Sequence, residues 1–360
     1  MSCNWNLTSA VYDPVNGLVY AVNCPLNEVL VFNTSNYHIS SIQVGKEPTG
    51  ITVNPTNGYL YVSNKGNGTI SVINPDTGEV VNTIYVGGSP TKIVYGDGYL
   101  YVFNRLSNGS DVIDVVSQHG VVGEIITENY SDIVYDPVTG YAVFSTTNGG
   151  IYAIKGTKVV ASNTSDEFNC ITVGPAYVLA VNPNNGDIYG ESNTSIIVYN
   201  PYNLSIINVI STSGYPYSLT YYNNALYSLK AVLIASALGY VDITENLCEI
   251  NLKNGSSKVL ATFPSEYNSE AEFYCYSKYN VLTGANNELI AVGTSPSPIA
   301  IVNVTSGVWM GIGVNVDDID GVYDPITGYI YAVDHYSNII YVINPATDKV
   351  VKILPTVFSP

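Results

Sequence analysis

The chain has 360 residues, of which 46% are hydrophobic and only 11% are charged. Its 12 basic and 29 acidic residues give a formal net charge of −17, which repels the phosphate groups of nucleic acids and of anionic membranes. We therefore expect no nucleic-acid partner, and because no apolar run approaches the roughly 18 residues of a membrane span, we expect no membrane span.

A repeated unit organises the chain, and residues 51–86 show it most completely. Two apolar runs are joined there by Asn54-Pro55-Thr56-Asn57-Gly58, and two more by Asn74-Pro75-Asp76-Thr77-Gly78. Asn caps such a turn, Pro fixes φ and Gly accepts a positive φ, so each segment predicts a β-hairpin. Because a polar loop at 64–68 joins the hairpins, the unit predicts four antiparallel strands, which we call A, B, C and D.

The turn between strands A and B recurs along the chain. Its glycines lie 40 to 46 residues apart over the first five copies, which is the spacing of a four-stranded propeller blade. These glycines are Gly17, Gly58, Gly98, Gly140 and Gly186, followed after a longer interval by Gly328. Two degenerate copies fill that interval. The predicted repeats are approximately 8–45, 49–86, 91–127, 131–162, 176–211, 217–263, 271–314 and 319–355.

The repeats predict one all-β domain over residues 1–360, a β-propeller of four-stranded antiparallel blades. We predict eight blades, with seven as the alternative. Blades stack face to face, so tyrosines such as Tyr20, Tyr61, Tyr101 and Tyr331 on strands B are expected in the core. Strand D, at the rim, is expected to alternate between buried and exposed residues.

The strand-B segments resemble those of a known family. They read Tyr20-Ala21-Val22-Asn23, Tyr61-Val62-Ser63-Asn64, Tyr101-Val102-Phe103-Asn104 and Tyr331-Ala332-Val333-Asp334, and the second unit ends Val86-Gly87-Gly88-Ser89-Pro90. With the Asn-Pro-Asp-Thr-Gly turn, they resemble the YVTN repeat family of β-propellers, common in archaeal and bacterial surface-layer and secreted proteins. The resemblance is close in units one to four and eight and weak in units six and seven. It implies a propeller and a location at the cell surface or outside the cell, but no catalytic residues.

Sequons for N-glycosylation support an exterior location. Several fall in predicted loops and turns, where a glycosyltransferase can reach them. The ten candidates are Asn6, Asn33, Asn67, Asn108, Asn129, Asn163, Asn193, Asn203, Asn254 and Asn303. We expect an extracellular or surface-exposed glycoprotein, and a virion surface is also compatible.

The five cysteines fit an oxidising compartment. Cys3 precedes the first strand A and Cys24 follows the first strand B, so a disulfide between them is expected. Cys248 and Cys275 fall in neighbouring units and are the second expected pair. Cys170 is left as a buried free thiol, because its spacing matches no zinc motif.

No catalytic motif is present. Two of the three histidines, His38 and His119, fall in CD turns as solvated polar residues, and Asp317-Asp318-Ile319-Asp320-Gly321 lacks the spacing of a calcium loop. We expect no metal, cofactor or catalytic residue, and favour a binding or adhesion module for a protein or glycan. The alternatives are a lactonase-like or quinoprotein-like enzyme with an axial metal or cofactor, and a receptor-binding domain of a virion or surface filament.

Recognition is expected on the face formed by the BC loops and the connections from D to the next A, which we call the BC face. These segments differ between units, whereas the AB turns are nearly uniform, and variation on a rigid scaffold is where specificity is built. The predicted contacts are Arg105, Glu191, Asp334, His335, Tyr130 and Tyr215. A polar rim is expected at the ends of strands B, formed by Asn23, Asn64, Asn104 and Asp334. Residues 231–244 are expected to be a long BC loop that folds over one face or forms part of a partner interface.

Overall fold

The apolar runs and Pro-Gly turns form β-strands, as the repeat predicts. The computed structural model describes residues 7–127, 129–147, 149–164, 179–192, 195–212, 214–235, 241–254, 256–264, 279–283, 288–293, 299–306, 309–312, 319–324, 327–334, 339–344, 347 and 349–355. These residues contain 32 strands in eight four-stranded antiparallel sheets, each built from four consecutive strands. In this part of the chain no helix has the length and apolarity of a membrane span.

The first four blades run from strand A beside the axis to strand D at the rim. Blade 1 contains β1 (Leu7–Asp13), β2 (Leu18–Asn23), β3 (Glu28–Asn33) and β4 (Ile39–Gln43). Blade 2 contains β5 (Pro48–Val53), β6 (Leu60–Asn64), β7 (Thr69–Asn74) and β8 (Glu79–Tyr85). Blade 3 contains β9 (Ser89–Gly96), β10 (Tyr99–Arg105), β11 (Asp111–Ser117) and β12 (Gly120–Thr127). Blade 4 contains β13 (Tyr130–Asp136), β14 (Tyr141–Thr146), β15 (Ile151–Lys155) and β16 (Lys158–Asn163).

The other four blades follow the same order. Blade 5 contains β17 (Leu179–Val181), β18 (Ile188–Ser192), β19 (Ser195–Tyr199) and β20 (Ile206–Ser211). Blade 6 contains β21 (Tyr215–Tyr222), β22 (Ala225–Ala235), β23 (Val241–Ile250) and β24 (Ser257–Pro264). Blade 7 contains β25 (Tyr279–Thr283), β26 (Glu288–Gly293), β27 (Ile299–Asn303) and β28 (Trp309–Ile312). Blade 8 contains β29 (Ile319–Asp324), β30 (Tyr329–Asp334), β31 (Ile339–Asn344) and β32 (Lys349–Pro355).

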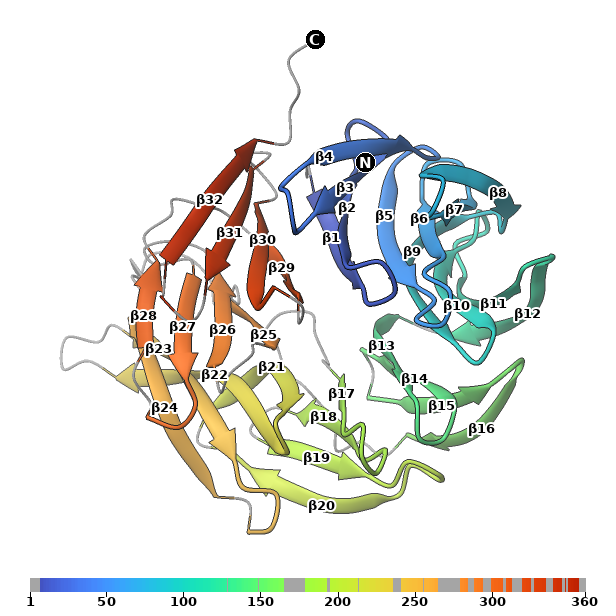
Figure 1. Cartoon of the computed structure of the whole chain (residues 1–360). Coiled ribbons are helices and arrows are strands. Elements are labelled where there is room, and N and C mark those ends of the chain that lie inside the picture. Colours follow the sequence, from blue (N-terminus) through green and yellow to red (C-terminus); the bar gives the residue numbers. More distant parts are fainter. Residues whose placement is uncertain are drawn as a thin grey trace.

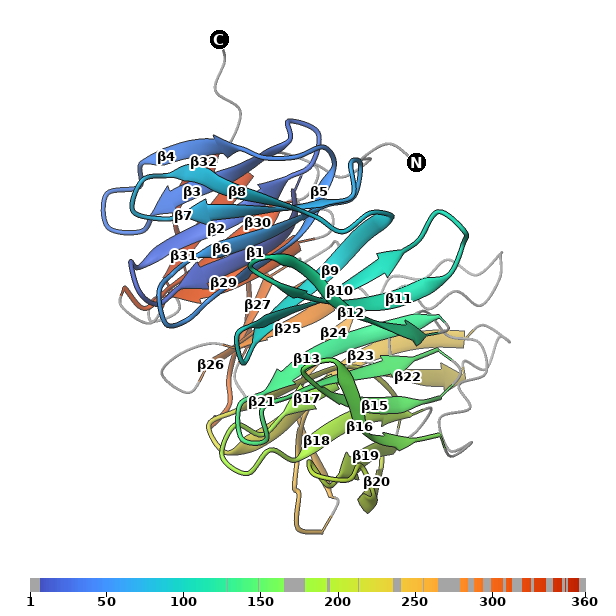
Figure 2. The same cartoon turned by 90° about the vertical axis from the view of Figure 1, so that its right-hand side faces the viewer.

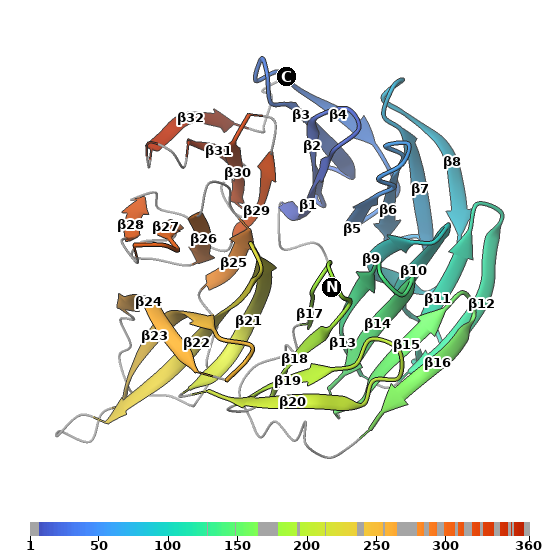
Figure 3. The ribbon, with the colours of Figure 1, turned by 60° about the horizontal axis from the view of Figure 1, so that its bottom comes forward.

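The blades form a closed ring, a β-propeller. Each innermost strand contacts the next in the order β1, β5, β9, β13, β17, β21, β25 and β29, and β29 contacts β1 again. Figure 1 shows these strands around the axis with β8, β12, β16 and β20 outside them, and Figure 3 shows the ring from a second angle. The sheets therefore match the count of eight repeat units, and none of them contains strands from both ends of the chain.

The core lies between the faces of neighbouring blades. Tyr20, Val29 and Ile42 of blade 1 pack with Ile51 and Leu60 of blade 2, and similar clusters lie between other blades. Figure 2 shows the strands of blade 1 stacked against those of blade 2. Strands B and C are buried on both faces, which explains their apolar residues at successive positions. The prediction that strand-B tyrosines belong to the core is confirmed for Tyr20, Tyr101 and Tyr331, which are buried, whereas Tyr61 is half-buried.

The AB turns have the predicted chemistry. The side-chain oxygen of Asp13, Asn54 or Asp136 accepts a hydrogen bond of 2.9 to 3.0 Å from the backbone N–H two residues later. The turn glycines adopt a positive φ, for example 71° at Gly17 and 72° at Gly58, which only glycine adopts without strain.

The prediction that strand D alternates is confirmed for β12 and β16 beyond their bulges. It is wrong for β8, β20 and β32, and most D strands carry a β-bulge. In β8, β12, β16, β20, β24 and β32 one residue is skipped in the pairing with strand C. β8, β20 and β32 are therefore largely exposed, with one buried anchor each at Ile84, Ile210 and Leu354. A bulge disrupts the ladder of an edge strand, and so the outer edges of these blades are poor templates for pairing with another strand.

The segment 231–244 is not a long loop. β22 and β23 pair from Leu226 with Ile250 to Ala235 with Val241, so the hairpin extends through most of that segment. The β-branched and apolar residues Val232, Ile234, Val241 and Ile243 favour strand pairing over a folded-back loop. Residues 236–240 lie outside the described part.

The disulfide prediction for Cys248 is wrong. Cys248 is a free, buried thiol on β23. It packs among apolar residues between blades 5 and 6, including Leu226 and Ile250. Burial raises the pKa of its thiol, and the charge and hydrogen bond of the buried Lys230 oppose that rise. Cys24 is disulfide-bonded, but Cys3, Cys170 and Cys275 lie outside the described residues, so the predicted pairing of Cys3 with Cys24 stays a prediction.

The seam between blades 8 and 1 is closed by side-chain packing. Phe32 of β3 lies 4.8 Å, centroid to centroid, from the ring of Tyr331 of β30. Val19, Ile340 and Leu354 belong to the same cluster.

We expect Phe32→Ala to weaken the seam specifically. Loss of a buried phenyl group costs about 3 to 5 kcal/mol, and no shared strand joins these blades. Hydrogen exchange should increase mainly in β1–β4 and β29–β32. The matched control is Phe103→Ala, whose ring stacks on Tyr130 at 4.0 Å within the blade 3 to 4 interface. Identical exchange patterns in the two variants would show that the seam is not a distinct weak point.

Candidate functional site

Bulges in strand A lie at the BC face, where the innermost strands begin. The pairing of strands A and B skips residues at the start of β1, β5, β9, β13 and β21. Bulges re-aim side chains next to functional sites. The residues skipped in β5, β9 and β13 are the polar Thr49, Thr91, Lys92, Ser131 and Asp132.

These polar residues link the innermost strands of successive blades. The Thr49 hydroxyl of β5 donates to the carbonyl oxygen of Pro90 at the start of β9, at 3.2 Å. The Ser63 hydroxyl donates to the carbonyl oxygen of Thr91. The Thr91 hydroxyl lies 3.3 Å from the hydroxyl of Tyr130 on β13. Blades 2, 3 and 4 are thus joined by hydrogen bonds near the axis.

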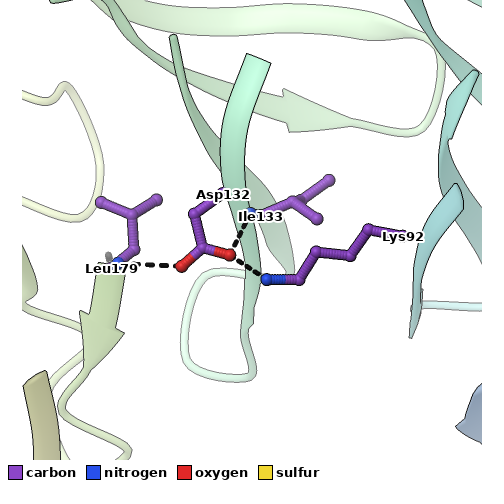
Figure 4. Close-up of polar contacts among 4 residues, drawn as sticks. All are labelled: Lys92, Asp132, Ile133 and Leu179. Atoms are coloured by element: carbon purple, nitrogen blue, oxygen red, sulfur yellow. Dashed lines mark hydrogen bonds and ion pairs between the residues drawn. The ribbon is translucent and has the colours of Figure 1, made fainter. Parts of the chain in front are cut away.

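Asp132 continues this chain to blade 5. Figure 4 shows its carboxylate between Lys92 of β9 and Leu179 of β17. One oxygen accepts from the Lys92 ammonium group and, at 2.8 Å, from the backbone N–H of Ile133. The other accepts from the backbone N–H of Leu179 at 3.0 Å. Because both oxygens of this buried carboxylate already have donors, it holds the strands in place and is poorly suited to act as a base.

The asparagines that end strands B do not form a polar rim. Asn23, Asn64 and Asn104 are buried. The Asn64 amide donates to Thr69 and Ser71 of its own blade at 3.1 and 2.9 Å. The Asn104 amide donates to Asp114 at 2.7 Å and to the carbonyl oxygen of Gly87 at 3.1 Å. The buried amides of Asn64 and Asn104 thus stabilise the BC loops and D-to-A connections by hydrogen bonds.

In blades 2 and 3, a glycine in the D-to-A connection makes room for the side chain of the asparagine that ends strand B. A Cβ atom on Gly45 would lie 2.5 Å from Cγ of Asn64, and one on Gly88 would lie 2.5 Å from Oδ1 of Asn104. Gly88 also has φ of 58°. We call this pairing of a strand-B asparagine with a connection glycine the Asn–Gly clamp. It fixes the backbone of the BC face in blades 2 and 3 and leaves the adjacent loop side chains free to vary.

The predicted binding-face residues divide into two groups. Arg105 ends β10 with its side chain 64% exposed, and its nearest guanidinium nitrogen is 3.9 Å from the Asp111 carboxylate. Glu191, in contrast, is buried within β18, and Tyr130 is half-buried against Phe103, so neither is an open surface contact. Asp334 and Tyr215 lie at the ends of their strands, and His335 lies outside the described residues.

The sequons differ in accessibility. Asn67, Asn108, Asn129, Asn203 and Asn254 are exposed. Asn33, Asn163 and Asn303 are half-buried, and the amide nitrogen of Asn163 donates to the carbonyl oxygen of Leu204 at 3.0 Å. That bond must break before a glycan can be attached at Asn163. Asn6 and Asn193 lie outside the described part.

The carboxyl group of Asp114 carries the clearest electrostatic perturbation near this face. Asp114 is fully buried in the middle of β11. Burial raises its pKa to about 6; the hydrogen bond from Asn104 opposes the rise and the Glu124 charge adds to it. Among described residues, no group of three or more His, Cys, Asp and Glu side chains could hold a metal ion. Asp317 and Asp318 lie outside these residues.

Comparison with known proteins identifies the architecture alone. No protein-family model and no curated protein sequence matches the chain. The solved structure of Kuenenia stuttgartiensis hydrazine synthase is similar over 96% of this chain and 97% of that one, with 15% identity and a TM-score of 0.57. The dihydro-heme d1 dehydrogenase NirN matches over 96% of this chain and 74% of its own, with 14% identity and a TM-score of 0.68. The WD40 propeller domain of Doa1 shares 13% identity, with coverage of 83% and 92% and a TM-score of 0.52.

We expect Gly88→Ala to destabilise the protein more than Gly78→Ala. Both glycines have a positive φ, 58° and 66°, so each substitution carries a backbone cost of about 1 to 2 kcal/mol. Only the Cβ at position 88 would collide, because nothing lies within 4 Å of one at position 78. The collision should add about 1 to 3 kcal/mol, measured by chemical denaturation. Equal losses would show that the Asn–Gly clamp adapts without cost.

We expect Asp114→Asn to stabilise the protein at pH 7.5 and to have little effect near pH 4. The raised pKa means that the folded state binds this proton more tightly than the unfolded chain. The protonated Asp114 carboxyl group therefore stabilises the folded protein below pH 3.8, the pKa of the group in the unfolded chain. This stabilisation is lost as the pH rises through about 6, the pKa in the folded protein. The gain is at most about 3 kcal/mol, seen as a pH-dependent difference in Tm. The exposed Asp97→Asn serves as control, and a gain independent of pH would contradict the assignment.

Proposed function

We propose that this protein is a non-enzymatic binding or adhesion module that recognises a protein or glycan partner through its BC face. The observation that carries the proposal is the construction of that face in blades 2 and 3. Asn–Gly clamps fix the loop backbones, while Lys65 and Arg105 extend outward from them. Rigid loops with differing side chains suit selective recognition, because little conformational entropy is lost on binding.

The opposite face supports this choice by contrast. Its AB turns repeat one capped hairpin, and their Asp and Asn side chains are engaged with the turn backbone. Those groups stabilise the scaffold and offer little chemical variety from blade to blade. Selectivity is more easily built on the BC face.

We further propose an extracellular or cell-surface location. The exposed sequons, for example Asn108, Asn203 and Asn254, are accessible to a glycosyltransferase. The strand-B and turn motifs resemble the YVTN repeats of surface-layer and secreted propellers, which favours the same compartment. A virion surface is a variant of this proposal, because it too displays a binding module outside a cell.

The proposal is tested by obstructing one face at a time. A ten-residue Gly-Ser insertion between Ser107 and Asn108 enters an exposed BC loop, and the same insertion between Asp97 and Gly98 enters the AB turn of the same blade. Exposed loop tips tolerate such insertions. We expect the first insertion to abolish capture of the partner from native envelope extracts and the second to preserve it.

The opposite result would place recognition on the AB face. A stoichiometric metal or an organic cofactor in protein purified from its native source would instead favour the enzyme alternative. Elemental analysis and an absorption spectrum of the intact protein detect either one.

A further inference from the structure

A strip of basic and aromatic residues crosses the BC face of blades 2 and 3. It consists of Lys46, Lys65, Tyr85 and Arg105, which we call the basic strip. Lys46 and Arg105 are exposed, Lys65 is half-exposed, and Tyr85 is 75% exposed at the end of β8. A fourth nearby cation, Lys92, is neutralised by Asp132.

The loops that carry the strip form one continuous surface. The N–H groups of Lys65 and Gly66 donate to the carbonyl oxygens of Glu47 and Lys46, both at 2.9 Å. One loop further, Gly87 donates to the carbonyl oxygen of Gly68 at 3.0 Å. A Cβ on Gly87 would lie 3.7 Å from the Tyr85 hydroxyl, and one on Gly88 would lie 2.6 Å from the Arg105 carbonyl oxygen. The phenol ring of Tyr85 thus lies beside the junction between the two basic loops.

The cations of the strip are available to a ligand. Lys46 and Lys65 make no ion pair with the described residues, and Arg105 approaches Asp111 only to 3.9 Å. The acidic side chains near the strip include Glu47, Asp111, Asp132 and Glu28. Asp132 is committed to Lys92, and the buried Glu28 accepts from the amides of Asn23 and Gln43. At physiological ionic strength charges are screened beyond about 8 Å, so the net charge of −17 does not cancel the local field of the strip.

The other described cations lie elsewhere. Lys155 and Lys158 flank the CD turn of blade 4, Lys253 and Lys258 flank that of blade 6, and Lys349 and Lys352 belong to β32. Lys352 is engaged with the ring of Tyr37, 4.2 Å from its centroid. Lys230 is fully buried. Only the basic strip therefore combines accessible cations with an exposed aromatic ring on the BC face of the described chain.

We propose that the basic strip binds an acidic glycan that carries carboxylate or sulfate groups. Tyr85 offers a flat apolar surface for a sugar ring together with a polar hydroxyl. Lys46 and Lys65 supply mobile ammonium donors, and Arg105 supplies a planar fork that matches a carboxylate or sulfate. This inference rests on the proposed function, for which it names the ligand class and the blades involved.

The test uses full-length protein produced without glycosylation, because Asn67 and Asn108 lie in the same loops. Binding of hyaluronan and heparin oligosaccharides is measured by calorimetry, with a neutral dextran oligosaccharide as comparison. We expect the acidic probes to bind and dextran not to bind. Added salt should weaken the affinity for heparin.

Variants locate the site. The triple variant Lys46→Ala, Lys65→Ala, Arg105→Ala should lose at least tenfold in affinity, and Tyr85→Ala about three- to tenfold, with unchanged Tm. The control Lys155→Ala, Lys158→Ala, Lys253→Ala removes the same charge at the CD turns and should bind as the wild type does. Equal losses of affinity in both triple variants would show that only the net charge matters and would overturn the inference. Absence of binding to both acidic probes would overturn it as well.

The inference and the proposed function fail in different ways. If the insertion after Ser107 abolishes capture of the native partner while the basic-strip variants capture it normally, the result supports recognition through the BC face. The same result contradicts an acidic glycan as the ligand of the basic strip. If that insertion leaves capture intact, the proposed function itself is wrong.

Discussion

Burial between neighbouring blades is the interaction on which this structure depends. A four-stranded sheet with two apolar faces is not stable alone, because each face needs a partner. Clusters of buried apolar side chains cover these faces between blades 1 and 2, 3 and 4, and 8 and 1. The ring is the arrangement in which every blade is covered on both sides without a special cap.

Buried tyrosines show how this core accommodates polar atoms. Burial raises the pKa of Tyr20, Tyr101 and Tyr189 to about 12, so these phenols stay protonated at physiological pH. The Tyr20 oxygen accepts from the Asn16 amide at 2.9 Å, and that of Tyr101 accepts from the backbone N–H of Gly156 in blade 4 at 3.1 Å. Each ring fills the space between blades while its hydroxyl reaches the turns at the edge.

The fold was predictable from the sequence because the AB turns are local signals. An Asp or Asn, a Pro and a Gly within five residues specify the hairpin at Asp13 or Asn54 whatever lies elsewhere. Their spacing then gives the unit and the number of sheets. The bulges at Val81 or Val351 were not predictable, because they arise from the pairing of strand D with strand C and have no marker residue. The long hairpin of β22 and β23 was not predicted, because strands B and C of the other units are shorter and suggest a loop at this position.

The candidate site was predictable only in outline. The variable loops indicated the face and Arg105, but the burial of Glu191 and the engagement of the strand-B asparagines depend on packing against the next connection. Asp132 was also missed, although aligning the strand-A isoleucines Ile93 and Ile133 places it at the same position as Lys92. Asp114 had a visible signal, because it is the one carboxylate within the apolar run 112–116 of β11. A polar residue that interrupts such a run must find its hydrogen-bond partners inside the core, as Asp114 does with Asn104.

The seam between blades 8 and 1 has a mechanical consequence for the ring. No strand is shared between blades 1 and 8, so a force applied to the two ends of the chain acts on the packing of Phe32 against Tyr331 and on the outermost strand β32. An outer strand pulled from its end separates one hydrogen bond at a time, whereas strands pulled along their length must break many together. Under tension this ring is therefore expected to open at blade 8 first, while the basic strip on blades 2 and 3 keeps its shape.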